Sequence, residues 1–340
     1  MPLTPRPTTG PTATARAAVL SRRAVLAAGT ALLLGACGSG ATGSAAPAAP
    51  GTGAGAFPRS VRHELGETEV ASAPARVVAA TDGAELASLL ALGVRPVGFG
   101  QRDDPVHPWT AEGLAALGGD VETYDLSGGE TSFEQLAAWA PDLVVVQEGF
   151  ATEDNLARFA GVAPTVATSF IDWRASLRQV ADALGRPEDG ERLISESDSA
   201  TAAARTRLTA AAGRRLAMVV SFATGEDYVL NAASPVGKLA PQLGLAPFPE
   251  GRTEGEAVDQ VPAELLGEQL ADADRIAVLV FEEGDDPLAR LLARPLVAAV
   301  PAVAAGRIGA LSIPESNAAY FDSVLTVPRN VALLERLAGA

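Results

Sequence analysis

The residues that decide the fold are PEDGERLISESDSATAAARTRLTAAAG, which run from Pro187 to Gly213. The stretch is rich in Ala, Arg, Glu and Leu, and its single internal glycine, Gly190, lies near its start. Pro187 suits a first helical turn and Gly213 suits a C-terminal stop, so the pattern predicts one helix over 188–212. At 1.5 Å per residue such a helix is about 35 Å long, enough to run along two lobes rather than inside one.

Short apolar runs alternate with amphipathic helices on both sides of this helix. Strands are predicted over 76–80, 96–100, 142–147, 214–222, 275–282 and 307–312. Helices are predicted over 84–93, 132–140, 236–243, 263–271 and 287–305, with breaks at Pro295 and Pro301 and a capping box at Ser132 and Gln135. Continuous hydrophobicity within the strands indicates burial on both faces, as in a parallel sheet covered by helices. The expected fold class is α/β: two Rossmann-like lobes with parallel sheets, joined by a single long α-helix, with a ligand cleft between the lobes.

The first 36 residues are typical of an export signal. Arg22 and Arg23 precede an uncharged run over 24–36, which is too short to span a bilayer because a spanning helix needs about 20 apolar residues. The arginine pair resembles a twin-arginine signal. Leu34-Gly35-Ala36-Cys37 resembles a bacterial lipobox, in which Cys37, the only cysteine in the chain, becomes lipid-modified. We therefore expect an exported protein, anchored by lipid to the outer face of the cell membrane.

Composition sets the remaining boundaries. Residues 37–56 are mostly Gly, Ala, Ser, Thr and Pro and are predicted to form a flexible tether. An N-terminal lobe is expected over 57–171, a linker with the bridging helix over 172–212, and a C-terminal lobe over 213–340. The net charge of −15 excludes binding to nucleic acid or to anionic lipid headgroups. We expect a monomer.

Several segments resemble one family. Residues 64–80 (ELGETEVASAPARVVAA), 89–98 (LLALGVRPVG) and 136–146 (LAAWAPDLVVV) closely resemble the substrate-binding lipoproteins of iron-siderophore uptake transporters. Residues 271–280 (ADADRIAVLV) and 295–309 (PLVAAVPAVAAGRIG) resemble the second lobe of those proteins. The resemblance implies a bilobal, helix-linked binding protein that captures a ferric siderophore and delivers it to an ABC permease and its ATPase. It implies a ligand, and no cofactor.

Ligands of open parallel sheets bind beyond the carboxyl ends of the strands, and large or charged residues in those loops are the candidates for contact. The predicted ligand-binding residues are Arg102, Trp109, Phe150, Tyr228, Glu282 and Tyr320. Arg102 would hydrogen-bond an iron-bound oxygen and Trp109 would cover the apolar face of the chelate. The competing interpretation is that Arg102 pairs with Asp103 or Asp104 and that Trp109 packs inside the first lobe. For docking on the permease, the resemblance points to Glu153 or its neighbour Asp154, with no matching acid near 238–242.

Other functions remain open at this point. A zinc or manganese site would need several imidazoles, and the chain has only His63 and His107, so no metal site is expected. Haem would need one axial ligand, for which His107 or Tyr228 is available, and cobalamin is bound by the same fold. No catalytic residue is expected, because the sequence lacks a Gly-x-Ser-x-Gly elbow and a phosphate-binding loop. A sensor lipoprotein or a hydrolase with scattered carboxylates are the alternatives from other classes.

Overall fold

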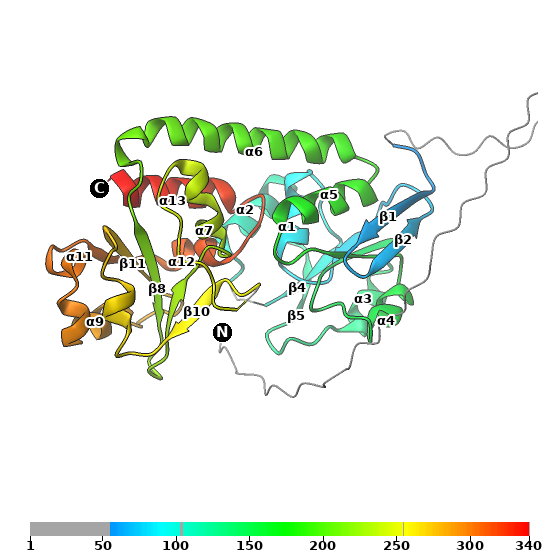
Figure 1. The fold of residues 1–340 in the computed structure, drawn as a ribbon. Coiled ribbons are helices and arrows are strands. Elements are labelled where there is room, and N and C mark those ends of the chain that lie inside the picture. Colours follow the sequence, from blue (N-terminus) through cyan, green and yellow to red (C-terminus); the bar gives the residue numbers. More distant parts are fainter. Residues whose placement is uncertain (1–54, 103–104, 254, 340) are drawn as a thin grey trace, which may run out of the picture. The chain divides into compact units, whose positions relative to one another are not determined.

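The computed structural model describes residues 55–102, 105–253 and 255–339 (Figure 1). Residues 50–340 form one compact unit that contains two five-stranded sheets. The predicted signal peptide, Cys37 and most of the predicted tether lie outside the described residues. The fold is α/β, with one sheet on each side of a long helix in the sequence, as predicted.

The first sheet is entirely parallel, in the order β5-β4-β3-β6-β7. Its strands are β3 (Val77–Ala79), β4 (Gly98–Gln101), β5 (Glu122–Asp125), β6 (Leu143–Gln147) and β7 (Thr165–Thr168). Its helices are α1 (Ala84–Ala91), α2 (Pro108–Ala116), α3 (Phe133–Ala138), α4 (Leu156–Ala160) and α5 (Trp173–Ala183). An antiparallel hairpin of β1 (Arg59–His63) and β2 (Gly66–Val70) precedes them. Strands β5 and β7 and the hairpin were not predicted.

The second sheet is mixed, in the order β10-β9-β8-β11-β12. Its strands are β8 (Leu216–Ser221), β9 (Asp227–Leu230), β10 (Val258–Val261), β11 (Arg275–Leu279) and β12 (Ile308–Ala310). Strands β8, β11 and β12 are parallel, whereas β9 runs antiparallel to both β8 and β10. Its helices are α7 (Pro235–Leu239), α8 (Leu266–Gln269), α9 (Pro287–Leu292), α10 (Pro295–Ala298), α11 (Pro301–Ala304), α12 (Ile313–Tyr320) and α13 (Val327–Gly339). The helix breaks expected at Pro295 and Pro301 are confirmed.

The long helix, α6 (Pro187–Arg207), connects the two halves of the fold. It begins at Pro187 as expected, and after Arg207 the chain tightens into a 3-10 turn (Thr209–Ala211) before Gly213, which has a φ of 76°. The helix packs on α5 of the first half and on α13 of the second half (Figure 1). Among the described helices, none is both long and apolar enough to cross a membrane.

The central strands β3, β6, β8 and β11 are buried on both faces, which confirms the interpretation of their continuous hydrophobicity. In β3, Val77 and Ala79 belong to one apolar cluster and Val78 belongs to another. The larger cluster is shared by the two halves: it extends from the first sheet through α5, α6 and α13 to β8, with Val77, Leu177, Ile194, Leu334 and Met218 among its members. The two sheets therefore share a common apolar core.

Candidate ligand-binding site

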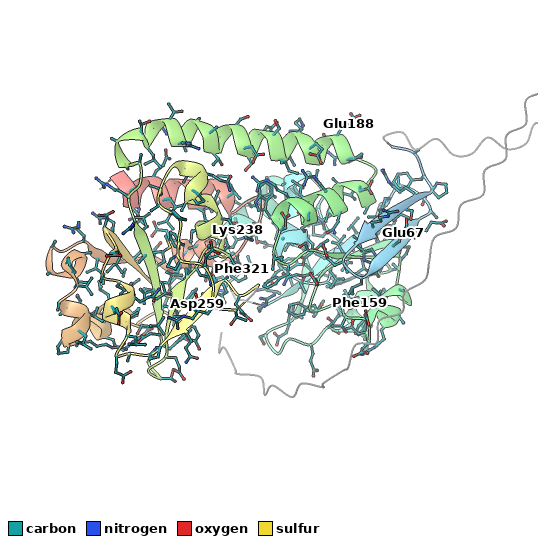
Figure 2. The ribbon with its side chains drawn as sticks, viewed as in Figure 1. Glu67, Phe159, Glu188, Lys238, Asp259 and Phe321 are labelled. Atoms are coloured by element: carbon teal, nitrogen blue, oxygen red, sulfur yellow. The ribbon has the colours of Figure 1, made fainter. Side chains whose placement is uncertain are left out.

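Two groups of loops at the carboxyl ends of the strands form the candidate site. We call residues 80–83, 102, 105–107, 126–131, 148–151 and 169–172 the first-sheet edge. We call residues 222–228 and 280–286 the second-sheet edge. The charged and aromatic side chains at these edges are described in turn below, and Figure 2 shows the side chains of the molecule as sticks.

Arg102 is the central cation of the first-sheet edge. It follows β4 directly, its backbone N–H donates to Asp82 Oδ2 at 2.9 Å, and its Nη2 lies 3.5 Å from Asp82 Oδ1. The guanidinium lies over the ring of Phe150, with 5.1 Å between Cζ and the ring centroid. Its side chain is only 11% exposed, yet Nε and Nη2 have no hydrogen-bond partner among the described residues. Unsatisfied buried N–H groups of this kind are donors available to a ligand oxygen.

Glu85 lies in the first turn of α1, close enough to Arg102 for their charges to interact, and is fully buried. Its Oε1 accepts hydrogen bonds from the Thr81 hydroxyl and, at 3.3 Å, from the Gly83 backbone N–H. Its Oε2 has no partner among the described residues. Burial raises the pKa of Glu85 to about 7, with the charge of Asp82 adding to the rise and that of Arg102 opposing it.

Two arginines of the second half reach the second-sheet edge from α9 and the residues after it. Arg290 pairs with Asp285 and donates from Nη2 to the backbone oxygen of Ser221, the last residue of β8. Arg294 pairs with Asp227, whose side chain is fully buried. Each arginine at this edge is therefore already held by a carboxylate.

Aromatic rings join the two halves. Phe222 and Tyr228 meet edge to face at 5.9 Å, and Tyr320 meets both Phe281 and Phe321 edge to face at 6.0 Å. From the first half, His107 stacks on Trp109 at 4.4 Å and contacts Phe321 at 4.8 Å. The row Trp109–His107–Phe321–Tyr320–Phe281 therefore connects the loop after β4 with the loop after β11.

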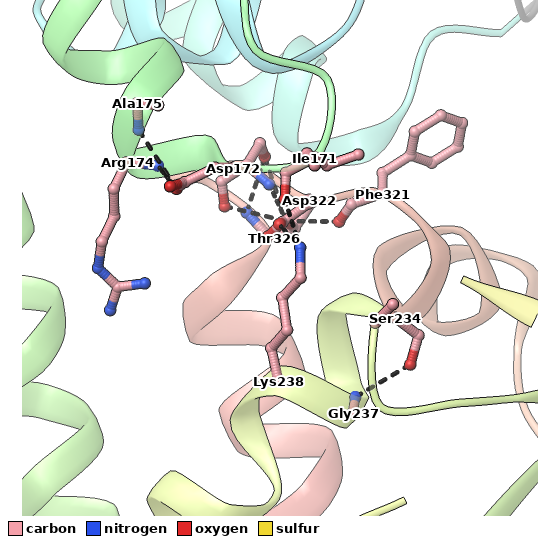
Figure 3. Close-up of polar contacts among 12 residues, drawn as sticks. Ile171, Asp172, Arg174, Ala175, Ser234, Gly237, Lys238, Phe321, Asp322 and Thr326 are labelled. Atoms are coloured by element: carbon pink, nitrogen blue, oxygen red, sulfur yellow. Dashed lines mark hydrogen bonds and ion pairs between the residues drawn. The ribbon is translucent and has the colours of Figure 1, made fainter. Parts of the chain in front are cut away.

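A polar contact links the halves next to this row (Figure 3). Lys238, on α7 and the only lysine of the chain, donates to the backbone oxygen of Ile171 in the first-sheet edge. Its Nζ also lies 3.0 Å from Oδ2 of Asp322, which follows Phe321. Burial raises the pKa of Asp322 and the charge of Lys238 lowers it. Figure 2 shows Lys238 and Phe321 in the same region of the molecule.

The structure brings some of the predicted site residues together and buries another. Arg102 and Phe150 are in contact, and Tyr228 lies close enough to Tyr320 to influence its ionisation. Trp109 is only 5% exposed, with its ring stacked on His107, so little of it faces outward as a cover for a ligand. Of the remaining predicted residues, Glu282 is exposed in the second-sheet edge, Glu153 is exposed before α4, and Cys37 lies outside the described residues.

Sequence reasoning missed several residues at the edges. Among the described residues, the acid that pairs with Arg102 is Asp82, from the loop after β3, and Asp103 and Asp104 lie outside the described residues. Arg290, in the last turn of α9, and Arg294, at the N-cap of α10, were also missed. Glu85 had a weaker signal, a charged residue in the first turn of an otherwise apolar helix. Nothing in the sequence pointed to Lys238 or Phe321 as contacts between the halves.

The described residues contain no group of three or more His, Cys, Asp or Glu side chains arranged to hold a metal ion. His63 is hydrogen-bonded to Thr68 at 2.9 Å within the β1–β2 hairpin. His107 is buried in the aromatic row.

Comparison with known proteins agrees with this architecture. The periplasmic binding protein family matches residues 78–312. The chain is 26% identical over 194 residues to YfiY, a probable siderophore-binding lipoprotein of Bacillus subtilis, covering 55% of this chain and 57% of that relative. The chain thus spans little more than half the length of this curated relative.

Solved structures extend the likeness to nearly the whole fold. A periplasmic solute binding protein from Mycobacterium smegmatis superposes with a TM-score of 0.71 at 25% identity, covering 82% of this chain and 97% of that one. PiaA of Streptococcus pneumoniae, solved in complex with ferrichrome, superposes with a TM-score of 0.68 at 23% identity, with coverage of 82% and 97%. At 23% identity, the similarity to PiaA is evidence for the fold alone.

Proposed function

Because the chain belongs to the periplasmic binding protein family, we propose that it captures a ferric siderophore outside the cytoplasm and delivers it to an ABC permease for iron uptake. In this proposal the ligand sits against the first- and second-sheet edges, and lipid on Cys37 anchors the protein to the outer face of the membrane. Glu153, exposed before α4, contributes to permease docking. The naming of the curated relative as a siderophore-binding lipoprotein supports both the ligand and the anchor.

The observation that supports the proposal most strongly is the hydrogen bonding of the Arg102 guanidinium. Its guanidinium is held by Asp82 and by the Phe150 ring, while Nε and Nη2 have no hydrogen-bond partner in the described part of the chain. A siderophore presents iron-bound oxygens with partial negative charge beside an apolar body. Charge-assisted hydrogen bonds from a preorganised guanidinium suit those oxygens, and the nearby rings suit the apolar body.

The charge of the edges favours one class of chelate. Acids outnumber arginines there, and Arg102, Arg290 and Arg294 are each paired with a carboxylate. Among the acids of the two edges are Asp82, Glu130, Glu148, Asp172, Glu226, Asp227, Glu282, Glu283, Asp285 and Asp286. Three hydroxamates neutralise Fe³⁺, whereas three catecholates leave a trianion, which these acids would repel. The edges therefore support a neutral or cationic ferric chelate.

A fluorescence-quenching panel tests the proposal. The probes are ferric hydroxamates, ferric catecholates, ferric citrate, haem and cobalamin. We expect a ferric hydroxamate to quench tryptophan emission, because Trp109 belongs to the aromatic row that joins the edges, and Trp109→Phe should remove most of the signal.

Two variants locate the ligand. Arg102→Ala should weaken binding by more than about tenfold, the equivalent of one charge-assisted hydrogen bond, and Tyr228→Ala should weaken it less. Glu67→Ala on the β1–β2 hairpin, away from both edges, is the matched control. Binding of no chelate in the panel would refute the proposed function. Unaltered affinity in both Arg102→Ala and Tyr228→Ala would refute the site.

A further inference from the structure

We propose that Glu85 is a positioning residue for Arg102, and that it presents Arg102 to the ligand only while its own carboxyl group is neutral. Ligand affinity would then fall as the pH rises through neutrality. This inference rests on the proposed function, because it takes Arg102 as a ligand contact.

Glu85 occupies the junction of three loops of the first-sheet edge. The Thr81 hydroxyl that donates to Glu85 also accepts from the Gln147 backbone N–H at 3.4 Å, which ties the loop after β3 to the end of β6. The Gly83 backbone N–H donates to the same Glu85 oxygen. One residue further back, Asp82 holds Arg102 through both its backbone and its guanidinium. Glu85 therefore supports the short segment that places Arg102.

The second carboxyl oxygen of Glu85, Oε2, has no hydrogen-bond partner among the described residues and is the atom that carries the proton in the neutral acid. Glu85 Oε2 and the side-chain oxygen of Gln147 both lie close to Gly83: a Cβ built there would lie 2.9 Å from the first and 2.1 Å from the second. Glu85 Oε1 is already an acceptor, so in the neutral acid the proton resides on Oε2. A neutral carboxyl group has a proton on Oε2 that it can donate to an acceptor on this side of Gly83, whereas a carboxylate has none.

The charged groups around Glu85 define what ionisation would do. Those that act on it are Asp82 from the loop after β3 and Arg102 from the end of β4, and Glu85 in turn acts on Tyr124 of β5. With Glu85 neutral, Asp82 is the one carboxylate among the described residues that pairs with Arg102, and the Nε and Nη2 N–H groups stay available to a ligand. An ionised Glu85 would repel Asp82 and attract the guanidinium inward, which competes with the ligand for the same N–H groups. The pKa of about 7, raised by burial, places this change in the physiological range.

The test is the dissociation constant of ferrichrome as a function of pH, between pH 5.5 and 8.5. A preference of the ligand for neutral Glu85 that is worth one pKa unit changes the affinity about tenfold. We expect that loss for the unaltered protein as the pH rises, and a flat profile at the low-pH affinity for Glu85→Gln, which mimics the neutral acid. Glu130→Gln, an exposed acid of the same edge, should keep the unaltered profile. Equal slopes for the unaltered protein and Glu85→Gln would overturn the inference.

A second readout needs no ligand. Infrared spectra should show the carbonyl stretch of a protonated buried carboxylic acid at pH 6, lost at pH 8.5 and absent in Glu85→Gln. If that band is missing at pH 6, the inference is wrong whatever the ligand. If the band is present but no chelate binds at any pH, the proposed function fails instead, and the role of Glu85 toward a ligand falls with it.

Discussion

Both sheet edges contain arginine–aspartate ion pairs, but the pairs differ in how far they are buried. At the first-sheet edge both Arg102 and Asp82 are nearly buried, and Glu85, whose charge interacts with both, is wholly buried. At the second-sheet edge Arg290 and Asp285 are each more than a quarter exposed, and only Asp227 is enclosed. Because water screens exposed pairs, the difference shows which charges are held in place by the protein and which can readjust around a ligand.

The largest effect should come from the one enclosed charge of the second-sheet edge. Arg294→Ala leaves the Asp227 carboxylate buried without its cation, and its Oδ1 already lacks a partner among the described residues. We expect a loss of about 4 kcal/mol in the free energy of unfolding, measured by urea denaturation.

The neighbouring pair provides the control for that prediction. Arg290→Ala removes a pair whose side chains are each about a quarter exposed and should cost about 1 kcal/mol. Adding Asp227→Asn to Arg294→Ala should recover much of the larger loss, because no buried charge then remains. Equal losses for the two arginine variants would show that the two pairs are screened alike.

The second largest effect is a pH dependence of the free energy of unfolding, which we expect from Glu85 at the first-sheet edge. Burial raises the pKa of Glu85 from 4.5 to about 7, so between these values the folded state binds more protons than the unfolded state. The stability contributed by neutral Glu85 is thus full below about pH 4.5, declines as the pH rises and is gone above about pH 7, a span on the order of 3 kcal/mol. Glu85→Gln cannot ionise and should lack this decline.

Chemical denaturation of both proteins at a series of pH values measures the difference, since all other titrating groups are common to them. The gap between Glu85→Gln and the unaltered protein should widen in favour of the variant from pH 5 to 7 and then stay constant. A gap that does not depend on pH would mean that Glu85 is ionised throughout, and the first-sheet edge would then resemble the second.

The sequence predicted the sheets better than the edges, for a physical reason. Apolar continuity in runs such as 142–147 reports burial, and burial on both faces leaves few arrangements other than a covered parallel sheet. Strands with little such continuity were not predicted. Strand β5 (ETYD) is mostly exposed, and β9 belongs to a hairpin in which the Phe222 N–H donates to the Glu226 backbone oxygen. The helix after residue 187 was predictable because both of its end signals are local.

The pairings at the edges depend on residues far apart in the chain. Arg102 was predicted as a ligand contact from its place after a strand, but its partner Asp82 lies twenty residues earlier and on another strand end. The surroundings of Trp109 also depend on distant residues: a large ring in a polar loop suggested a ligand contact, and Phe321, more than two hundred residues later, helps to cover it. Sequence patterns report periodicity and local geometry, and neither determines which loops meet.

The smallest effect concerns the contact that connects the edges across the halves. Lys238→Met removes the hydrogen bond to the Ile171 oxygen and the cation beside Asp322 while keeping an unbranched side chain. We expect a loss of about 1–2 kcal/mol, limited because Lys238 is itself partly exposed and because Asp322, whose pKa burial already raises, can take up a proton. The shared apolar core should keep the halves together, so the small-angle scattering profile of the free protein should barely change.

The control is Arg329→Met, which breaks the more exposed pair with Glu112 and should cost less stability still. If Lys238→Met instead loosened the protein and abolished chelate binding, the halves would be held by this contact rather than by the core, and the two edges could not be treated as separate surfaces.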